Sequence, residues 1–204
     1  MRIIITSTLC LLILLASNAL AESINGRLGF TGKVGFIMPL KDLTINGYPD
    51  GSIDTGFAGG GGLIYGLNDN FALELDVTHA PSSNVTSTWL NVGDLQTTDI
   101  SFGIQYRFMP KEHLVPYVGV GADFITGDIQ NASVDWSYGG HVNVGVDYFL
   151  NKNIALTADF KYVIGSKSDI ELFGITRGKY DPMSFIGTFG VRLYLAENWW
   201  KFGL

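Results

Sequence analysis

The sequence predicts an all-β protein, an eight-stranded antiparallel up-and-down transmembrane β-barrel. Apolar and polar residues alternate with a period of two in segment after segment, which places one set of side chains on each face of a strand. The 204-residue chain is 47% hydrophobic and only 16% charged. No run of about 18 apolar residues, enough for a membrane-spanning helix, follows residue 21. Because only helices and closed barrels satisfy the backbone inside a bilayer, an exported apolar chain of this kind indicates a barrel.

The first 21 residues have the features of a secretory signal peptide. Arg2 is the single positive charge before an almost continuous apolar stretch, Ile3–Ala16, and Ala19-Leu20-Ala21 has the small residues of a cleavage site. Cys10, the only cysteine, lies within that stretch, so the mature protein is expected to have neither a disulfide nor thiol chemistry. The expected parts are a signal peptide, an outer-membrane barrel and a short periplasmic tail, at residues 1–21, 22–195 and 196–204.

The first four predicted strands are residues 27–36, 57–65, 71–78 and 99–108. The first keeps Phe30 and Phe36 on one face, and the second, although rich in glycine, keeps Phe57 and Tyr65 in phase. In the third and fourth, every second residue is apolar. This alternation excludes an amphipathic helix, whose apolar residues would recur every three or four positions.

The last four predicted strands are residues 117–125, 141–148, 154–162 and 185–195. Pro116 precedes the first of these and, having no N–H to donate, is expected at a strand start. In the last, Phe185 and Phe189 lie on the face opposite Thr188 and Arg192. Eight is an even number of strands and the smallest usual size of an outer-membrane barrel.

The connections alternate between short and long. The short ones are residues 67–70, 109–114 and 150–153. The long, polar ones are residues 38–53, 80–95, 126–137 and 165–183. Outer-membrane barrels have short periplasmic turns and long external loops, so both ends of the mature chain are expected in the periplasm. Two of the turns share the pattern Leu-Asn-x-Asn, which we interpret as one solution used by two hairpins.

The polar faces of the strands predict a charged network inside the barrel, where eight strands leave just enough room for side chains. The predicted interior residues are Arg27, Lys33, Glu74, Asp76, Asp99, Arg107, Asp123, His141, Asp147, Asp159, Lys161 and Arg192. Glu74 and Asp76 are spaced by the strand period, and Arg107 is their expected cross-strand partner. His141 is interpreted as a satisfied interior histidine.

Large aromatic residues occupy the opposite faces, which are expected to meet lipid. Tyr65, Tyr106 and Tyr148 fall near the turn-proximal ends of their strands and are predicted to form an interfacial girdle. The alternative is a soluble, lipocalin-like barrel. It would need the charged faces outside and the aromatic faces inside, which would leave no space for a ligand.

The last strand resembles the signal by which the bacterial barrel-assembly machinery recognises its clients. The stretch Thr188–Leu195 has the order polar, x, Gly, x, x, apolar, x, apolar. The usual signal ends the chain, whereas this sequence continues through Ala196–Leu204, which includes Trp199 and Trp200. The tail is expected either to anchor at the inner membrane interface or to be a loose end.

With these residues placed, residues 24–195 resemble the outer membrane protein W (OmpW-like) family. The resemblance depends on the order and spacing of five motifs: Arg27-Leu-Gly29 with Pro39, Val115-Pro-Tyr-Val-Gly-Val-Gly121, Gly145-Val-Asp-Tyr148, Ala158-Asp-x-Lys-Tyr162 and Tyr180-Asp-Pro182. It implies a barrel in the bacterial outer membrane with a hydrophobic channel for small apolar solutes. Lipopolysaccharide and outer-membrane lipid are the expected surroundings. Related barrels serve structural or adhesion roles, so a non-transporting, surface-interaction barrel is the alternative function.

Apolar residues in the predicted external loops are candidates for a hydrophobic funnel. We single out Trp89, Leu90, Ile129, Trp136, Leu172 and Phe173. The alternative is that they pack the loops together or lie against lipopolysaccharide. Pro39 and Pro116 would either open a strand edge in the wall or simply end strands.

Other functions find little support in the sequence. The 13 basic residues are outnumbered by 19 acidic ones, which disfavours nucleic-acid binding. No histidine has a serine two residues away on the same strand face, as a lipid A deacylase would need, so we expect no enzyme. The glycine-rich stretches 59–62 and 119–121 precede no helix, and the three histidines lack metal-ligand spacing, so no cofactor or metal is expected.

Overall fold

The computed structural model describes residues 23–41, 44–45, 52–86, 91–129, 132–172 and 175–195. The predicted signal peptide and the tail after residue 195 lie outside these residues. Among the described residues, no helix is long and apolar enough to cross a membrane.

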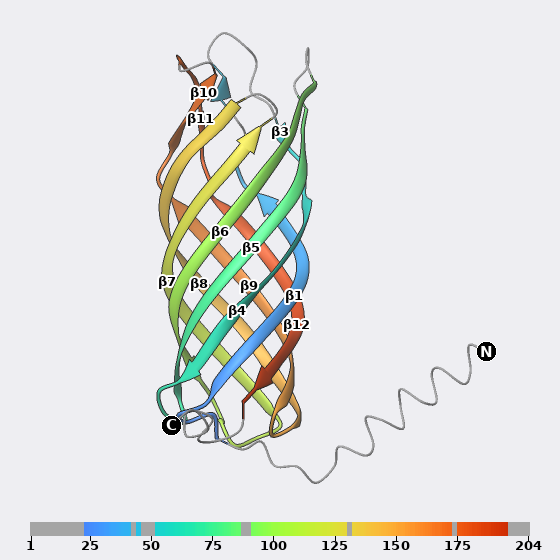
Figure 1. Cartoon of the computed structure of the whole chain (residues 1–204), viewed down its shortest axis with the longest axis vertical. Helices are drawn as coiled ribbons and strands as arrows, with labels where there is room; N and C mark the ends of the chain where they lie inside the picture. The colour runs from blue at the N-terminus through green and yellow to red at the C-terminus, as the bar shows by residue number, and fades with distance from the viewer. Residues whose placement is uncertain are drawn as a thin grey trace, which may run out of the picture.

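Eight long antiparallel strands close into a barrel, as the sequence predicts (Figure 1). In order around the wall they are β1 (Leu28–Pro39), β4 (Gly56–Gly66), β5 (Phe71–Thr86), β6 (Asn91–Arg107), β7 (Leu114–Ile129), β8 (Ala132–Asn151), β9 (Ile154–Gly165) and β12 (Ser184–Tyr194). The barrel closes because β12 pairs with β1 along its full length, from Gly29–Tyr194 to Pro39–Ser184. No free edge therefore remains between the first and last strands.

Four short strands extend the wall at the end away from the tight turns (Figure 1). They are β2 (Thr44–Ile45), β3 (Ser52–Ile53), β10 (Ser168–Leu172) and β11 (Ile175–Tyr180). The β10–β11 hairpin pairs with β8 through β10 and with β2 through β11, while β3 pairs with β5. The stretch 165–183, predicted to be loop, is therefore partly strand.

The strands on both sides of two predicted external loops are longer than the sequence suggested. Residues 80–95 and 126–137 were expected to be loops, but β5 and β6 continue to Thr86 and from Asn91, and β7 and β8 continue to Ile129 and from Ala132. Polar residues occupy successive positions in these stretches of the sequence, so the alternation disappears. The backbone pairing continues nonetheless, because it does not depend on side-chain polarity.

Neighbouring strands are staggered, so a path that follows cross-strand partners around the wall does not return to the residue where it began. From Thr98 on β6, the cross-strand partners lead around the wall to Pro116 on β7, whose carbonyl accepts a hydrogen bond from the amide of Phe108, back on β6. The partners in between are His79, Gly59, Val34, Phe189, Ala158 and Val146. A circuit thus returns ten residues along the same strand. With eight strands, this stagger corresponds to a tilt of about 40°, typical of outer-membrane barrels.

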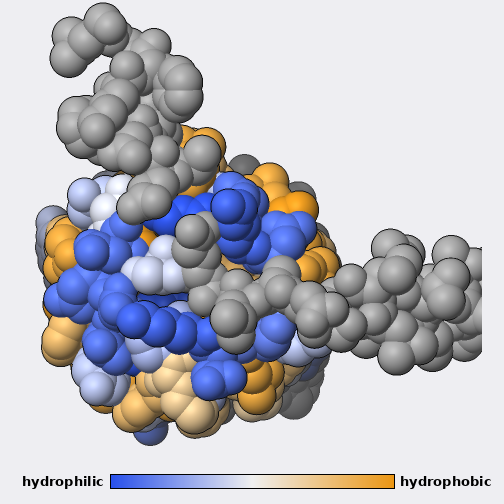
Figure 2. All heavy atoms as spheres, turned by 90° about the horizontal axis from the view of Figure 1, so that it is seen from below, coloured by the Kyte–Doolittle hydropathy of each residue, from blue (hydrophilic) through white to orange (hydrophobic). Residues whose placement is uncertain are grey.

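The outside of the wall is apolar and the inside is charged. Phe160 and Val144 are 60% and 55% exposed, whereas Arg107 and Asp147 on the inner face are 1% and 0% exposed. The end with the tight turns is polar, with apolar residues around its edge (Figure 2). Exposed charge on the outer face would be costly in hydrocarbon, and charge without partners would be equally costly inside. The hydrocarbon-facing side is therefore the aromatic one, as the sequence predicts.

Candidate functional site

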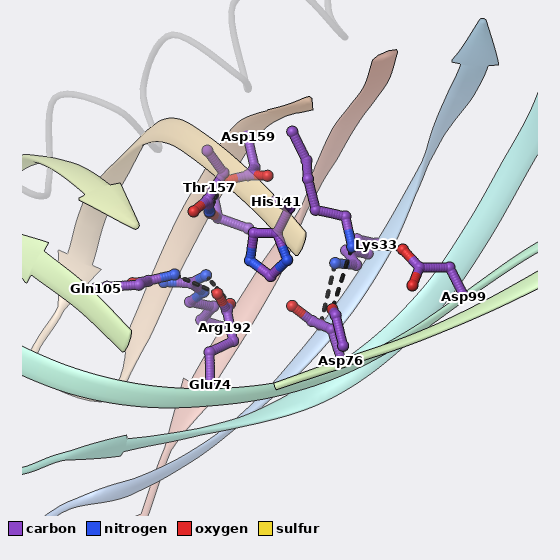
Figure 3. Close-up of polar contacts among 12 residues, drawn as sticks. Lys33, Glu74, Asp76, Asp99, Gln105, His141, Thr157, Asp159 and Arg192 are labelled. Atoms are coloured by element: carbon purple, nitrogen blue, oxygen red, sulfur yellow. Dashed lines mark hydrogen bonds and ion pairs between the residues drawn. The ribbon is translucent and has the colours of Figure 1, made fainter. Parts of the chain in front are cut away.

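Two arginines and two carboxylates form an ion cluster in the half of the barrel near the tight turns. Arg192 lies between Asp147 and Glu74, with Nη1–Oδ2 at 3.0 Å and Nη2–Oε1 at 2.6 Å. Arg107 Nη1 lies 2.8 Å from the same Asp147 oxygen. Gln105 donates a hydrogen bond from Nε2 to the other oxygen of Glu74 (Figure 3). The cluster is neutral, with two positive and two negative groups.

A second cluster lies farther toward the outer mouth, centred on Lys161. The Lys161 Nζ is 2.5 Å from Asp99 Oδ2, 3.1 Å from Asp123 Oδ1 and 3.1 Å from Ser101 Oγ. His141 is buried beside it, with Nδ1 2.9 Å from Asp123 Oδ1. His141 thus lies in the barrel interior, as interpreted from the sequence, with a carboxylate as its partner.

Further polar contacts lie between and beside these clusters. Asp159 accepts hydrogen bonds from Tyr117 Oη at 3.0 Å and from Asn143 Nδ2 at 2.8 Å. Lys33 Nζ lies 3.0 Å from Asp76 Oδ1 (Figure 3). Buried carboxylates need such partners because an isolated charge in a low-dielectric interior is strongly disfavoured.

Arg27 belongs to the end with the tight turns rather than to either cluster. Its Nη1 donates to the Lys152 carbonyl at 2.7 Å and its Nε to the Leu195 carbonyl at 3.0 Å. The guanidinium lies over the Tyr194 ring at 5.6 Å. Arg27 is nearly fully buried, and it ties the start of β1 to the end of β12.

The expected pairing of Arg107 with Glu74 and Asp76 is wrong. Glu74 lies opposite Gly103 on β6, so Arg107 is four residues closer to the end with the tight turns. Arg107 instead binds Asp147, while Arg192 binds Glu74. The stagger of the strands, which the sequence does not display, determines these partners.

Together the clusters fill the middle of the bore. Four cationic side chains face six carboxylates and one histidine: Lys33, Arg107, Lys161 and Arg192, with Glu74, Asp76, Asp99, Asp123, Asp147, Asp159 and His141. Eight strands enclose little more space than such side chains occupy. In the described part of the chain, these side chains therefore occupy the middle of the bore.

Apolar layers cover the charged middle on both sides. The layer toward the tight turns consists of Ile24, Ile64, Ala72, Val115, Phe149, Ala155 and Tyr194. The layer toward the mouth, here called the outer apolar ring, consists of Ile37, Ala58, Ala80, Ile125, Val163 and Ile186. Ile125 and Val163 come two residues after Asp123 and Lys161, so they point to the same inner face. Sequence reasoning missed the ring, although these residues continue the inward phase of each strand.

The wall is irregular beside the outer apolar ring. The register between β5 and β6 shifts between Ala80 and Ser83, on either side of Pro81. Continuous pairing of β4 with β5 ends at Gly59–His79. Ala80, a member of the ring, therefore borders a stretch of wall with fewer cross-strand hydrogen bonds, and Pro81 has no N–H to contribute.

The two prolines considered from the sequence do not mark such an irregularity. Pro39 ends β1 opposite Ser184. Pro116 lies opposite Val146, two residues after the start of β7 at Leu114. The signal that could have directed attention to Pro81 instead is its position at the start of a polar stretch, directly before Ser82, Ser83 and Asn84.

The funnel residues are only partly within the described structure. Trp89, Leu90 and Phe173 lie outside it, and Ile129 and Leu172 are the last residues of β7 and β10, whose side chains are not described. Trp136 is 53% exposed and shares the outward phase of Tyr138 and Val142. Its neighbour Ser137 takes the inward position, so Trp136 faces away from the bore. Trp136 therefore does not line a funnel.

The predicted girdle residues lie on the outer surface near the tight turns. Tyr65 pairs with Leu28 and Tyr106 with Phe71, and Tyr148 lies opposite Leu114. Tyr106 also contacts Phe108 edge to face, with centroids 4.9 Å apart.

The fold has close counterparts among solved structures. The outer membrane protein OprG from Pseudomonas aeruginosa superimposes with a TM-score of 0.68 at 17% identity, over 85% of this chain and 99% of that one. AlkL, solved in DMPC bilayers, gives 0.57 at 18% identity, over 86% and 92%. Neisserial surface protein A gives 0.57 at 17% identity, over 83% and 97%. None of the curated proteins compared with the sequence matches it.

These likenesses confirm the predicted fold, an eight-stranded antiparallel β-barrel. A family model, the outer membrane protein beta-barrel domain, matches residues 7–192. The match covers nearly the whole chain, including every strand of the barrel wall except the last two residues of β12. The chain belongs to the outer membrane protein beta-barrel domain family, whose proteins reside in the bacterial outer membrane.

Proposed function

We propose that this barrel lets small hydrophobic molecules cross the bacterial outer membrane passively. The solute would enter at the mouth, rest on the outer apolar ring and leave sideways into lipid. The observation that carries the proposal is the position of the ring, directly above the charged clusters and beside the irregular wall at Pro81. An apolar molecule is favoured on the ring but cannot continue through buried ion pairs, because it would displace partners that those charges need.

The proposal includes the route to the membrane. The signal peptide would be removed at export, and the assembly machinery would recognise the last strand. Lipopolysaccharide would surround the outer half of the barrel. The apolar surface, with Phe57 and Phe160 each 60% exposed, supports a lipid environment because so large an apolar surface is unfavourable in water.

A surface-interaction barrel is the second candidate. The β5–β6 and β7–β8 hairpins continue as paired strands to Thr86–Asn91 and Ile129–Ala132, beyond the outer apolar ring. Such extensions would present paired backbone to a partner outside the cell. They do not require an apolar ring inside the wall.

Uptake of a small aromatic hydrocarbon separates the two functions. Cells that lack the protein would be complemented with the wild type, with Ile125→Thr/Val163→Thr in the ring, or with Ile164→Thr on the lipid face, and naphthalene entry followed by fluorescence. We expect the ring variant to lower entry several-fold and the Ile164→Thr control to leave it unchanged. Equal entry with and without the protein would overturn the transport proposal and favour the second candidate.

A further inference from the structure

Two adjoining cavities lie on the outside of the barrel at its periplasmic edge. The first is an apolar groove of about 400 Å³ in the lipid-facing surface of β6, β7 and β8. Its floor consists of small branched side chains, Val118, Val120, Val142 and Val144, all half exposed on the outer face. Bulkier side chains flank the valines, because Phe102 of β6 lies opposite Ala122 of β7 and Phe160 of β9 lies opposite Val144 of β8. The valines therefore leave a depression in the apolar outer surface.

The second cavity, of about 530 Å³, is polar and lies at the turn between β4 and β5. Asn25, Asn68, Asp69 and Asn70 line it. Phe71 and Tyr106 line both cavities, and their rings contact each other with centroids 5.2 Å apart. The groove therefore leads directly into the polar cavity, which belongs to the polar periplasmic end of the barrel (Figure 2).

A charge of each sign lies at or beside the polar cavity: Asp69 is one of its lining residues, and Lys111 pairs with Asp69 from outside that lining. Lys111, in the next turn, has its Nζ 3.6 Å from Asp69 Oδ2, and the two side chains are 73% and 37% exposed. At this distance and exposure the ion pair is weak, so both groups can take other partners. Asp69 also accepts a hydrogen bond from Ser23 Oγ, which fixes the carboxylate at the edge of the cavity.

We propose that the two cavities together bind one phosphoethanolamine lipid of the periplasmic leaflet. An acyl chain lies in the valine groove, which begins at the interface beside Tyr106 and continues toward the middle of the membrane. The headgroup occupies the polar cavity, where Lys111 pairs with the phosphate and Asp69 with the ammonium. The short turns place this end in the periplasmic leaflet, where phospholipid is found.

The headgroup contacts make the site selective. Any lipid-facing surface touches acyl chains, so the groove alone would not distinguish one lipid from another. A phosphatidylglycerol headgroup has the same phosphate but a neutral glycerol in place of the ammonium, so it would leave Asp69 without a cationic partner. Charge complementarity at Asp69 and Lys111 therefore favours phosphatidylethanolamine.

Native mass spectrometry of the full mature protein, purified in detergent and mixed with equal amounts of the two lipids, tests the site. We expect about fivefold more bound phosphatidylethanolamine than phosphatidylglycerol, a preference of the size that the one additional exposed charge pair, between Asp69 and the ammonium, provides. Asp69→Asn/Lys111→Gln should bring the ratio close to one. Asp54→Asn/Lys41→Gln, the same pair of changes at exposed positions of the opposite end, should leave it unchanged.

The groove has its own pair of variants. Val120→Phe fills it and should lower binding of both lipids, whereas Val34→Phe, equally exposed on the lipid face of β1, should not. Heat-dependent mobility on gels verifies that each variant is folded, and the single changes Asp69→Asn and Lys111→Gln replace the double variant if it is not. A wild-type ratio near one, or a ratio unaffected by the turn variants, would overturn the proposal.

Discussion

Arg192 of β12 and Glu74 of β5 form an ion pair across the bore, with Nη2 2.6 Å from Oε1. Two strands of the wall, β1 and β4, separate β12 from β5, so the contact passes through the interior rather than along a ladder. Arg192 also binds Asp147 of β8 and lies 5.2 Å from the centre of the Tyr117 ring of β7. The Arg192 guanidinium thus links β12 to residues of three other strands, β5, β7 and β8.

Replacing Arg192 with methionine should destabilise the barrel by about 3–5 kcal/mol. The change leaves Glu74 without a cationic partner and Asp147 with Arg107 alone, and removing one member of a buried ion pair has costs of this size. The free energy of unfolding in urea, measured with lipid vesicles, provides the check. The double variant Glu74→Gln/Arg192→Met should be less destabilised than the single change, because the stranded carboxylate is gone. A single variant as stable as the wild type would show that the pair has no structural role.

Adding a methyl group at Gly145 should destabilise the barrel by about 1–3 kcal/mol, the usual cost of overpacking. A Cβ there would lie 2.4 Å from the Tyr117 hydroxyl and 2.6 Å from the Ala158 carbonyl oxygen. Tyr117 would have to move away from Asp159, to which it donates. Gly32 is the matched control, because nothing lies within 4 Å of its added Cβ. Gly32→Ala should unfold at the same urea concentration as the wild type, and an equal loss in both variants would contradict the packing argument.

The two Leu-Asn-x-Asn turns should respond equally to the same change. Asn68 Oδ1 accepts from the amides of Asn70 and Phe71 at 2.9 and 2.8 Å. Asn151 Oδ1 accepts from the second and third amides after it at 2.9 and 3.0 Å. We expect Asn68→Ala and Asn151→Ala each to lose about 1 kcal/mol of stability, since a net hydrogen bond contributes about that much. Aspartate at either position keeps the side-chain acceptor and should therefore retain most of the stability that alanine loses. Unequal losses would show that the shared pattern does not have a shared role.

The sequence predicts those features that depend on a single strand or turn. Alternation identified all eight strands and the face of residues such as Asp147 and Phe160, and the repeated turns identified hairpins with matching hydrogen bonds. Alternation could not supply the ends of β5 and β6, because polar residues follow one another there. It also could not pair Arg192 with Glu74, 118 residues away, since that contact depends on the stagger accumulated around the whole wall. The outer apolar ring was missed for the same reason, because its members come from separate strands.

A charge placed on the apolar outer face of the barrel tests which side of the wall faces hydrocarbon. Phe160 lies on β9 between Val144 of β8 and Gly187 of β12, and it is 60% exposed. Phe160→Arg should destabilise the barrel in lipid vesicles by about 2–4 kcal/mol, because an arginine near the bilayer midplane has that cost, whereas near the interface the cost falls to about 0–1 kcal/mol. Trp136→Arg is therefore the control, since Trp136 shares the outward face of β8 but lies near its outer end. If Phe160→Arg instead left the protein as stable in vesicles as the wild type, or yielded a folded monomer in buffer without lipid, the aromatic face would not be the one that meets hydrocarbon.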